Sequence, residues 1–192
     1  SRPRRFGKSV TAQMLAAYYG RESDSGGQFD NLRIAKDNSY QKHLNQYNVV
    51  HLSMNSIPDD GNAYEDYMKL FKNAIRRDIL EAYPQLKEQE FNSLSEMLVA
   101  TDKQFIFIID ELDYIFSHEL YPEHYGDFLE FLRELLKDKP YVALVYMTGV
   151  LPIKKYSTGS ALNMFKEYTM LKDPSFEEYF GFTEDETEML CK

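Results

Sequence analysis

An uninterrupted apolar run, Phe105–Ile109, restricts the possible fold more than any other feature of the sequence. The run consists of aromatic and β-branched residues and lacks the polar alternation of a strand with one face in water. It therefore predicts a strand covered on both faces. A second run, Tyr141–Met147, predicts another buried strand, and it follows a helical pattern that stops before Pro140. We expect an α/β fold in which a mostly parallel sheet is flanked by helices and connected by right-handed crossovers.

The rest of the chain also alternates between predicted strands and predicted helices. The segment Tyr47–Met54 predicts a further strand, whereas Arg21–Asn31 is rich in Gly, Ser and Asp and predicts a surface loop. Ser93 and Glu96 predict a capping box. The predicted helices are Lys8–Gly20, Tyr64–Leu80 with a stop at Pro84, Ser93–Ala100, Phe128–Leu136, and a last one that begins with a capping box at Thr183–Glu186.

Composition excludes several classes of protein. The 192 residues are 43% hydrophobic and 28% charged, which is typical of a globular protein with a core. The net charge of −9 argues against a surface that clings to nucleic acid or anionic lipid. No apolar run approaches the roughly 20 residues that cross a bilayer, so we expect no membrane span. The single cysteine, Cys191, forms no internal disulfide and favours a reducing, cytoplasmic setting.

Gly7, Lys8 and Ser9 open the first predicted helix in the order of a phosphate-binding loop. Glycine lets the backbone approach a phosphate, lysine reaches the β and γ phosphates, and the serine hydroxyl can ligate Mg²⁺. Arg2 stands where the pattern has its first glycine, so a basic surface turn is the alternative. We expect ATP to be held by Arg4, Arg5, Phe6, Gly7, Lys8, Ser9 and Val10.

Asp110 and Glu111 directly follow the buried strand. An ATPase needs a carboxylate at the carboxyl end of a strand near the phosphate loop, so Asp110 is the candidate Mg²⁺ ligand. Glu111, on the other side of the strand end, could polarise the attacking water. A pair of turn or helix-capping carboxylates is the alternative. The two motifs support each other, since one strand and several helices fit between them.

Two other polar residues lie close to these strand ends. Thr148 follows the Tyr141–Met147 run, where its hydroxyl could contact the γ phosphate and the water, and an ordinary strand-end threonine is an equal alternative. Asp113 is expected to be a first-turn or loop-capping residue rather than a catalytic group. The four histidines have no spacing typical of a metal site or a catalytic triad. We interpret all four as structural or surface residues.

Four segments together resemble a known family. They are Ser1–Ser9, Asp110–Asp113, Tyr146–Lys155 and Gly181–Glu186, and they look like the predicted AAA-ATPase-like proteins of gut and other anaerobic bacteria. By this resemblance Lys8 and Ser9 bind phosphate and Mg²⁺, Asp110 binds Mg²⁺, Glu111 is the catalytic carboxylate and Thr148 is the sensor. An arginine at position 2 is normal in the family. Its members are similar to archaeal-type and signal-transducing P-loop ATPases of the additional-strand class, often with a C-terminal domain that resembles PD-(D/E)XK nucleases.

The resemblance also implies how the chain is divided. Residues 1–182 would be the P-loop ATPase core, and 183–192 the start of a following helical segment. The strand that leads into the phosphate loop would lie upstream of Ser1, although it is central in the sheet of the family. The chain does not begin with Met, so we expect it to belong to a longer protein. Its acidic residues between Asp173 and Glu188 are interpreted as a solvated face.

Three functions are compatible with these motifs. The first is an ATPase that couples hydrolysis to a conformational switch, and Glu111 distinguishes it from a mere binder. The second is a nucleotide-binding or interaction module with little turnover, in which a stimulating arginine would come from another subunit or domain. A small-molecule kinase is disfavoured, because no arginine follows Arg133 to form a lid. Arg4 and Arg5 could contact a nucleic acid, but the net charge disfavours that interpretation.

Overall fold

The computed structural model describes residues 1, 3–57, 63–156, 165–169, 187–189 and 191. Its strands form one three-stranded sheet in the order β1-β2-β3. Both pairings are parallel, as the alternation of strands and helices predicts. The strands are β1 (Asn48–Ser53), β2 (Phe105–Asp110) and β3 (Val142–Met147). Because the strands are parallel, all three carboxyl ends lie at one edge of the sheet.

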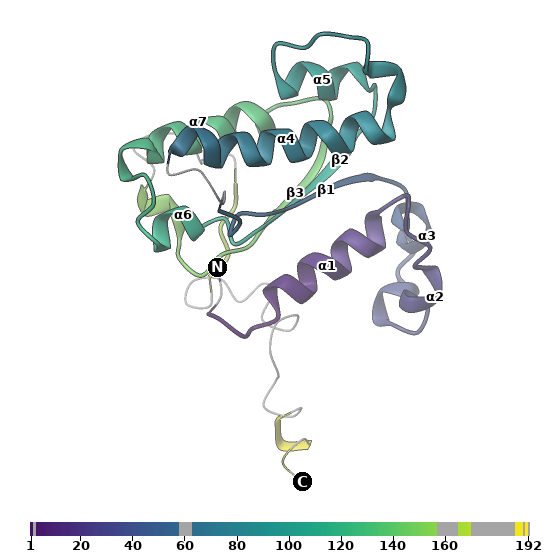
Figure 1. Cartoon of the computed structure of the whole chain (residues 1–192). Coiled ribbons are helices and arrows are strands. Elements are labelled where there is room, and N and C mark those ends of the chain that lie inside the picture. The colour runs from purple at the N-terminus through teal and green to yellow at the C-terminus, as the bar shows by residue number, and fades with distance from the viewer. Residues whose placement is uncertain (2, 58–62, 157–164, 170–186, 190, 192) are drawn as a thin grey trace.

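Helices cover both faces of this sheet (Figure 1). The helix α1 (Lys8–Tyr19) lies on one face. The opposite face carries α4 (Tyr64–Ala82), α5 (Leu94–Ala100) and α7 (Tyr125–Leu136). The shorter helices are α2 (Gly26–Phe29), α3 (Tyr40–His43) and α6 (Tyr114–Ser117), and turns of 3-10 helix occur at Arg33–Lys36, Pro84–Leu86, Pro122–His124 and Ile153–Tyr156.

The central strand β2 is buried along its whole length, as its composition predicts. Phe105, Phe107 and Ile109 pack into the main core, which is shared with α4, α5 and α7. Ile106 and Ile108 face the other way and pack with Ala12 of α1. Side chains alternate between the two faces of a strand, so burial on both sides requires apolar residues at every position.

The prediction that Tyr141–Met147 forms another buried strand is wrong in one respect. Ala143 and Leu144 of β3 are exposed, the latter at 41%. Among the described strands β3 pairs only with β2, so one of its edges is open. Apolar composition does not reveal whether a strand has one neighbour or two. Both edges of β2 are occupied, so the strand that the resemblance places before the phosphate loop would pair elsewhere than with β2. That strand stays a prediction.

The stretch predicted to be a surface loop, Arg21–Asn31, contains the short helix α2. Its Phe29 is buried against the ring of Tyr18, with 5.4 Å between the ring centroids. Nearby, the Asn45 side-chain amide donates hydrogen bonds to the carbonyls of Ala17 (3.0 Å) and Gly20 (2.8 Å). These bonds satisfy acceptors left open where α1 ends. Phe29 thus anchors the segment to α1, and Asn45 caps the end of that helix.

The capping box predicted at α5 is half confirmed. Ser93 Oγ accepts the hydrogen bond of the Glu96 amide at 3.1 Å, as predicted. The Glu96 carboxylate, however, accepts from the amide of Asn92 at 2.8 Å instead of that of Ser93. The capping box at Thr183–Glu186 and the domain boundary after residue 182 lie outside the described residues. In the described part of the chain, no helix is long and apolar enough to cross a membrane.

The direction of α1 follows from its connection to β1. The Tyr47 amide donates to the Tyr19 carbonyl at 2.9 Å, and the Arg21 amide donates to the Tyr47 carbonyl at 2.8 Å. The carboxyl end of α1 therefore lies at the amino ends of the strands. A helix of 12 residues and a strand of 6 both measure roughly 20 Å. The amino end of α1 thus lies toward the carboxyl edge of the sheet.

Truncation of a side chain in the central strand should lower the free energy of unfolding far more than truncation of a side chain in the edge strand. We expect Ile108→Ala, in the fully buried centre of β2, to lower the free energy of unfolding by about 2–5 kcal/mol, because it leaves a cavity between the sheet and α1. Leu144→Ala, on the open edge strand, should cost about 1 kcal/mol or less. Urea unfolding of both variants measures the difference. Equal costs would contradict the open edge and show that β3 is covered in solution.

Candidate functional site

The loop before α1 has the backbone conformation that its glycine permits. Gly7 has φ 72° and ψ 13°, in the left-handed region, and the helix begins at the next residue. A Cβ on Gly7 would meet no atom within 4 Å, so the need for glycine here is torsional and not steric. Arg5 also has a positive φ of 68°, which costs a non-glycine residue about 1 kcal/mol or more. The chain thus makes a sharp, strained turn into the helix.

Positive charge collects at this turn. The Lys8 ammonium folds back and donates a hydrogen bond to the Pro3 carbonyl at 2.9 Å. Arg4 and Arg5 are exposed beside it, and the first turn of α1 carries no acidic residue. The positive end of the helix dipole is therefore not neutralised by the helix itself. Ser9 and Val10 are exposed and Phe6 is half-buried. The arrangement has the charge and the unneutralised helix end that could hold an anion such as phosphate.

The candidate acidic residues lie where β2 ends. Asp110 is the last residue of β2 and is only 4% exposed. Its Oδ1 accepts hydrogen bonds from the Thr148 hydroxyl and, at 3.0 Å, from the Glu111 amide. Thr148 is also buried, at the end of the neighbouring strand β3. The structure thus brings Asp110 and Thr148 into direct contact, and both bonds fall on one oxygen of the carboxylate.

Glu111 occupies a turn that leaves the strand. Its φ is 53°, a conformation that non-glycine residues rarely adopt. Its carbonyl accepts the hydrogen bond of the Tyr114 amide at 2.9 Å, which leads the chain into α6. The side chain is half-buried, and within the described residues it makes no ion pair. A half-buried carboxylate of this kind can accept a proton from water.

Asp113 has the expected place in the chain, but its side chain bonds a distant turn. It stands at the start of α6, yet its side chain makes no capping hydrogen bond to that helix. Instead its carboxylate accepts the hydrogen bond of the Leu151 amide at 2.8 Å, and it is 4% exposed. The expected position at the start of a helix is therefore confirmed, but the carboxylate holds an amide of the turn after β3 and not one of its own helix. Only its place in the run Asp110–Asp113 could have drawn attention to it.

Two buried carboxyl groups lie at the ends of the strands. Asp110 and Asp113 are both buried, and neither has a cationic side chain within 4 Å among the described residues. Burial and, secondarily, the charge of Asp110 raise the pKa of the Tyr146 phenol to about 12. Buried carboxylates require a compensating charge or hydrogen bonds. A divalent cation at this edge would supply the charge.

The donor set fits Mg²⁺ better than a metal held by protein alone. No group of three or more His, Cys, Asp or Glu side chains in the described part of the chain could hold a metal ion. Mg²⁺ is commonly held by one or two carboxylates together with water and substrate phosphates. Asp110 offers the Oδ2 that its described hydrogen bonds leave unused, and the exposed Ser9 is the second residue of the helix whose start lies toward the same edge.

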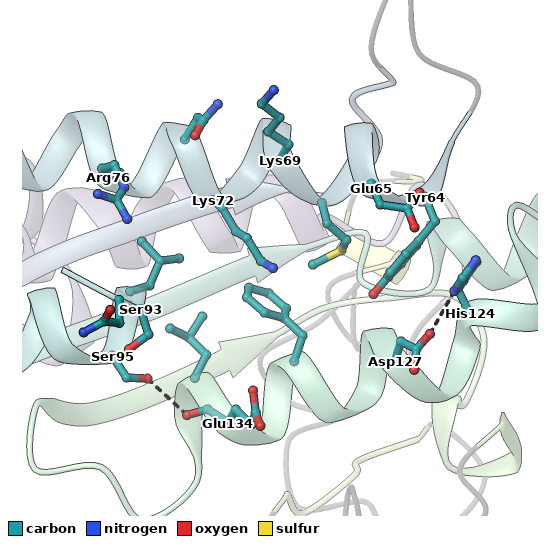
Figure 2. Close-up of a pocket in the computed structure, with 16 residues that line it drawn as sticks. Tyr64, Glu65, Lys69, Lys72, Arg76, Ser93, Ser95, His124, Asp127 and Glu134 are labelled. Carbon is teal, nitrogen blue, oxygen red and sulfur yellow. Dashed lines mark hydrogen bonds and ion pairs between the residues drawn. The ribbon is translucent and has the colours of Figure 1, made fainter. Parts of the chain in front are cut away.

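A separate groove lies between α4, α7 and the start of α5, on the opposite face of the sheet from α1. Figure 2 shows its lining, which encloses about 560 Å³. Lys72 lies over the ring of Phe131, with 5.2 Å from Nζ to the centroid. His124 is hydrogen-bonded to Asp127 at 2.8 Å, and this bond raises the pKa of the imidazole. None of the residues predicted to bind ATP or Mg²⁺ lines this groove.

A family model described as Predicted AAA-ATPase matches residues 1–158. No curated protein matches the chain. The matched part includes the turn into α1, the three strands and the turn after β3. It therefore covers both the basic and the acidic parts of the candidate site.

The Thr148 hydroxyl donates a hydrogen bond to the buried carboxylate of Asp110. We expect Thr148→Val, which keeps the shape of the side chain, to lower the free energy of unfolding by about 1–3 kcal/mol, because Asp110 loses a buried partner. Ser53→Ala is the control: its hydroxyl lies at the end of the neighbouring strand but is exposed. Urea unfolding should show a much smaller effect for the control. Similar small effects would mean that the bond between Thr148 and Asp110 does not persist in solution.

Proposed function

The chain belongs to the predicted AAA-ATPase family, and from that premise we propose that it binds ATP and Mg²⁺ at the carboxyl edge of its sheet and hydrolyses the nucleotide. One observation carries the proposal. The strained, basic turn at Gly7 opens α1, and α1 runs antiparallel to β2, whose last residue is the buried Asp110. A phosphate-attracting helix start and a strand-end carboxylate at one edge are what phosphoryl transfer requires.

Each residue of the loop has a part in holding the nucleotide. Lys8 pairs with the β and γ phosphates, and it exchanges its hydrogen bond to the Pro3 carbonyl for a phosphate oxygen. The amides that follow Gly7 face the anion, and the exposed Arg4 and Arg5 add positive charge. Phe6 and Val10 flank the loop and complete the contact surface.

The acidic edge supplies the metal site and the water. Ser9 and Asp110 hold Mg²⁺, which neutralises charge on the transferred phosphate. Glu111 orients the attacking water and accepts its proton. The Thr148 hydroxyl donates to Asp110 and would exchange this hydrogen bond for one to a γ-phosphate oxygen, so that a change at the phosphate is transmitted to the metal ligand. This link would couple hydrolysis to a conformational switch.

Two further elements belong to the proposal. A strand leading into the loop from upstream of Ser1 would pair at an open edge of the sheet, and beside β3 it would cover Leu144. An arginine that stimulates turnover would come from another subunit or domain. The alternative is a nucleotide-binding module with little turnover, in which the same residues bind ATP without hydrolysis.

Binding is tested first, with the full chain. We expect Lys8→Ala to weaken Mg²⁺–ATP binding by about 10- to 100-fold, because a charge-assisted hydrogen bond to phosphate is lost. Isothermal titration calorimetry measures the affinity. Lys87→Ala is the control, since this exposed lysine follows Pro84–Leu86, near the end of α4. Equal affinity in wild type and Lys8→Ala would remove the phosphate loop from the proposal.

Hydrolysis is a separate prediction. We expect Glu111→Gln to lower kcat about 10²- to 10⁴-fold while the affinity for ATP stays within about twofold, because the amide binds no proton from water. The matched control is Glu119→Gln, an exposed glutamate with the same left-handed backbone (φ 51°). Release of phosphate under single-turnover conditions gives the rate. Tight ATP binding with no turnover in the wild type would favour the nucleotide-binding module.

A further inference from the structure

We propose that Asp113 is a positioning residue of this site: its buried carboxylate ties the turn after β3 to the turn after β2 and thereby holds the Thr148 hydroxyl on Asp110. The inference rests on the proposed function of this edge. It concerns contacts between two segments that are far apart in the sequence, and these contacts are independent of any nucleotide. Asp113 itself does not touch the phosphate or the metal in this proposal.

The first observation is the long-range hydrogen bond. The Leu151 amide donates to Asp113 Oδ2 at 2.8 Å, across 38 residues of sequence. Asp113 is 4% exposed, so the bond is shielded from competing water. A hydrogen bond to an ionised carboxylate is roughly twice as strong as one between neutral groups. It fixes the turn that begins directly after Thr148.

The second observation is the close packing of Gly149. A Cβ at this position would lie 2.6 Å from Asp113 Oδ1 and 3.1 Å from its Cγ, well inside van der Waals contact. Gly149 is also buried. Its φ lies outside the left-handed region, so the requirement for glycine here is steric and not torsional. One oxygen of Asp113 therefore packs against the backbone of Gly149 while the other holds Leu151.

The third observation is the position of Asp113 in a series of contacts between the two segments. The Thr148 amide donates to the Ile109 carbonyl, and the Leu112 amide donates to the Thr148 carbonyl, both at 2.9 Å. The Thr148 hydroxyl then donates to Asp110. The Asp113 bond lies beyond these, past the last residue of β3, where strand pairing no longer restrains the chain. It is the last of the contacts that join the chain after β2 to the chain after β3.

This geometry has a consequence for the site. Thr148 is held on one side by β2 and on the other by the turn that Asp113 fixes. Release of that turn would let the hydroxyl rotate or shift away from Asp110. A displacement of about 1 Å at a reacting centre can cost a factor of about 10² in rate. Asp113 therefore acts on catalysis through Thr148, while the affinity for ATP depends on the loop at Lys8.

The first test is a double-mutant cycle in the full chain. Gly149→Ala should lower the urea midpoint of the wild type clearly, because the new methyl group collides with Asp113. In the Asp113→Ala background the same change should cost less than half as much, since the space is then vacant. Non-additivity of this kind is the signature of direct contact. If Gly149→Ala lowered the urea midpoint equally in both backgrounds, the proposed contact between Gly149 and Asp113 would be refuted.

The second test follows Thr148 itself by NMR. Asp113→Ala should shift the Thr148 methyl resonance, and Asp113→Asn, whose amide oxygen can still accept from Leu151, should leave it near the wild-type position. Thr101→Val is the matched control: Thr101 is buried and hydrogen-bonded to the Leu98 carbonyl at 2.7 Å, just before β2 begins. An unchanged Thr148 resonance in Asp113→Ala would overturn the proposal whether or not the protein hydrolyses ATP.

The third measurement separates positioning from simple stability. Asp113→Ala should lower kcat about 10- to 100-fold with the ATP affinity within about threefold, and Asp113→Asn should recover most of kcat. Thr101→Val should lower the urea midpoint but leave kcat unchanged. A loss of stability in Asp113→Ala without a loss of kcat would show that Asp113 stabilises the fold but does not position Thr148 for catalysis. A wild type that binds no ATP would refute the proposed function, and the NMR shift and the cycle would still decide on Asp113.

Discussion

Burial of β2 on both faces is the constraint on which the rest of the structure depends. Phe107 and Ile108 are fully buried on opposite sides of the strand, so helices must cover the sheet above and below. A polar residue can follow the strand only where the chain leaves the apolar layers on its two faces. Asp110 stands at that point, and its carboxylate is held by Thr148 from the adjacent strand. A polar group is thus placed with little freedom at the boundary of the core.

The opposite charges of the candidate site come from different layers of the fold. The basic turn belongs to α1, which packs through Ala12 on one face of β2. The acidic groups belong to the strand ends and to the turns that follow them. Because α1 runs antiparallel to the strands, its positive end and these carboxylates are directed to the same edge of the sheet. An Mg²⁺–phosphate complex would neutralise both.

Much of the fold was predictable because local patterns agree with the tertiary environment. The helical spacing up to Gly20 predicts α1, and the apolar run before Asp110 predicts β2. The prediction for β3 failed in part, because an apolar strand has the same composition whether its second edge is paired or open. The prediction of a surface loop at Arg21–Asn31 holds for most of its residues, which are exposed, but Gly26–Phe29 forms a helix whose Phe29 packs against Tyr18 of α1.

The sequence by itself determined the identity and order of the chemical groups: the turn at Gly7, the lysine and serine that begin α1, and the carboxylates that end β2. These follow from short-range rules of backbone torsion, strand burial and charge. The tertiary structure alone decided which groups meet. The Thr148 hydroxyl donates a hydrogen bond to Asp110, and the Leu151 amide donates one to Asp113. Both bonds form because the parallel pairing of β2 with β3 brings the ends of these two strands side by side. Contacts between residues so far apart depend on which strands pair, and the short-range patterns of the sequence do not reveal that pairing.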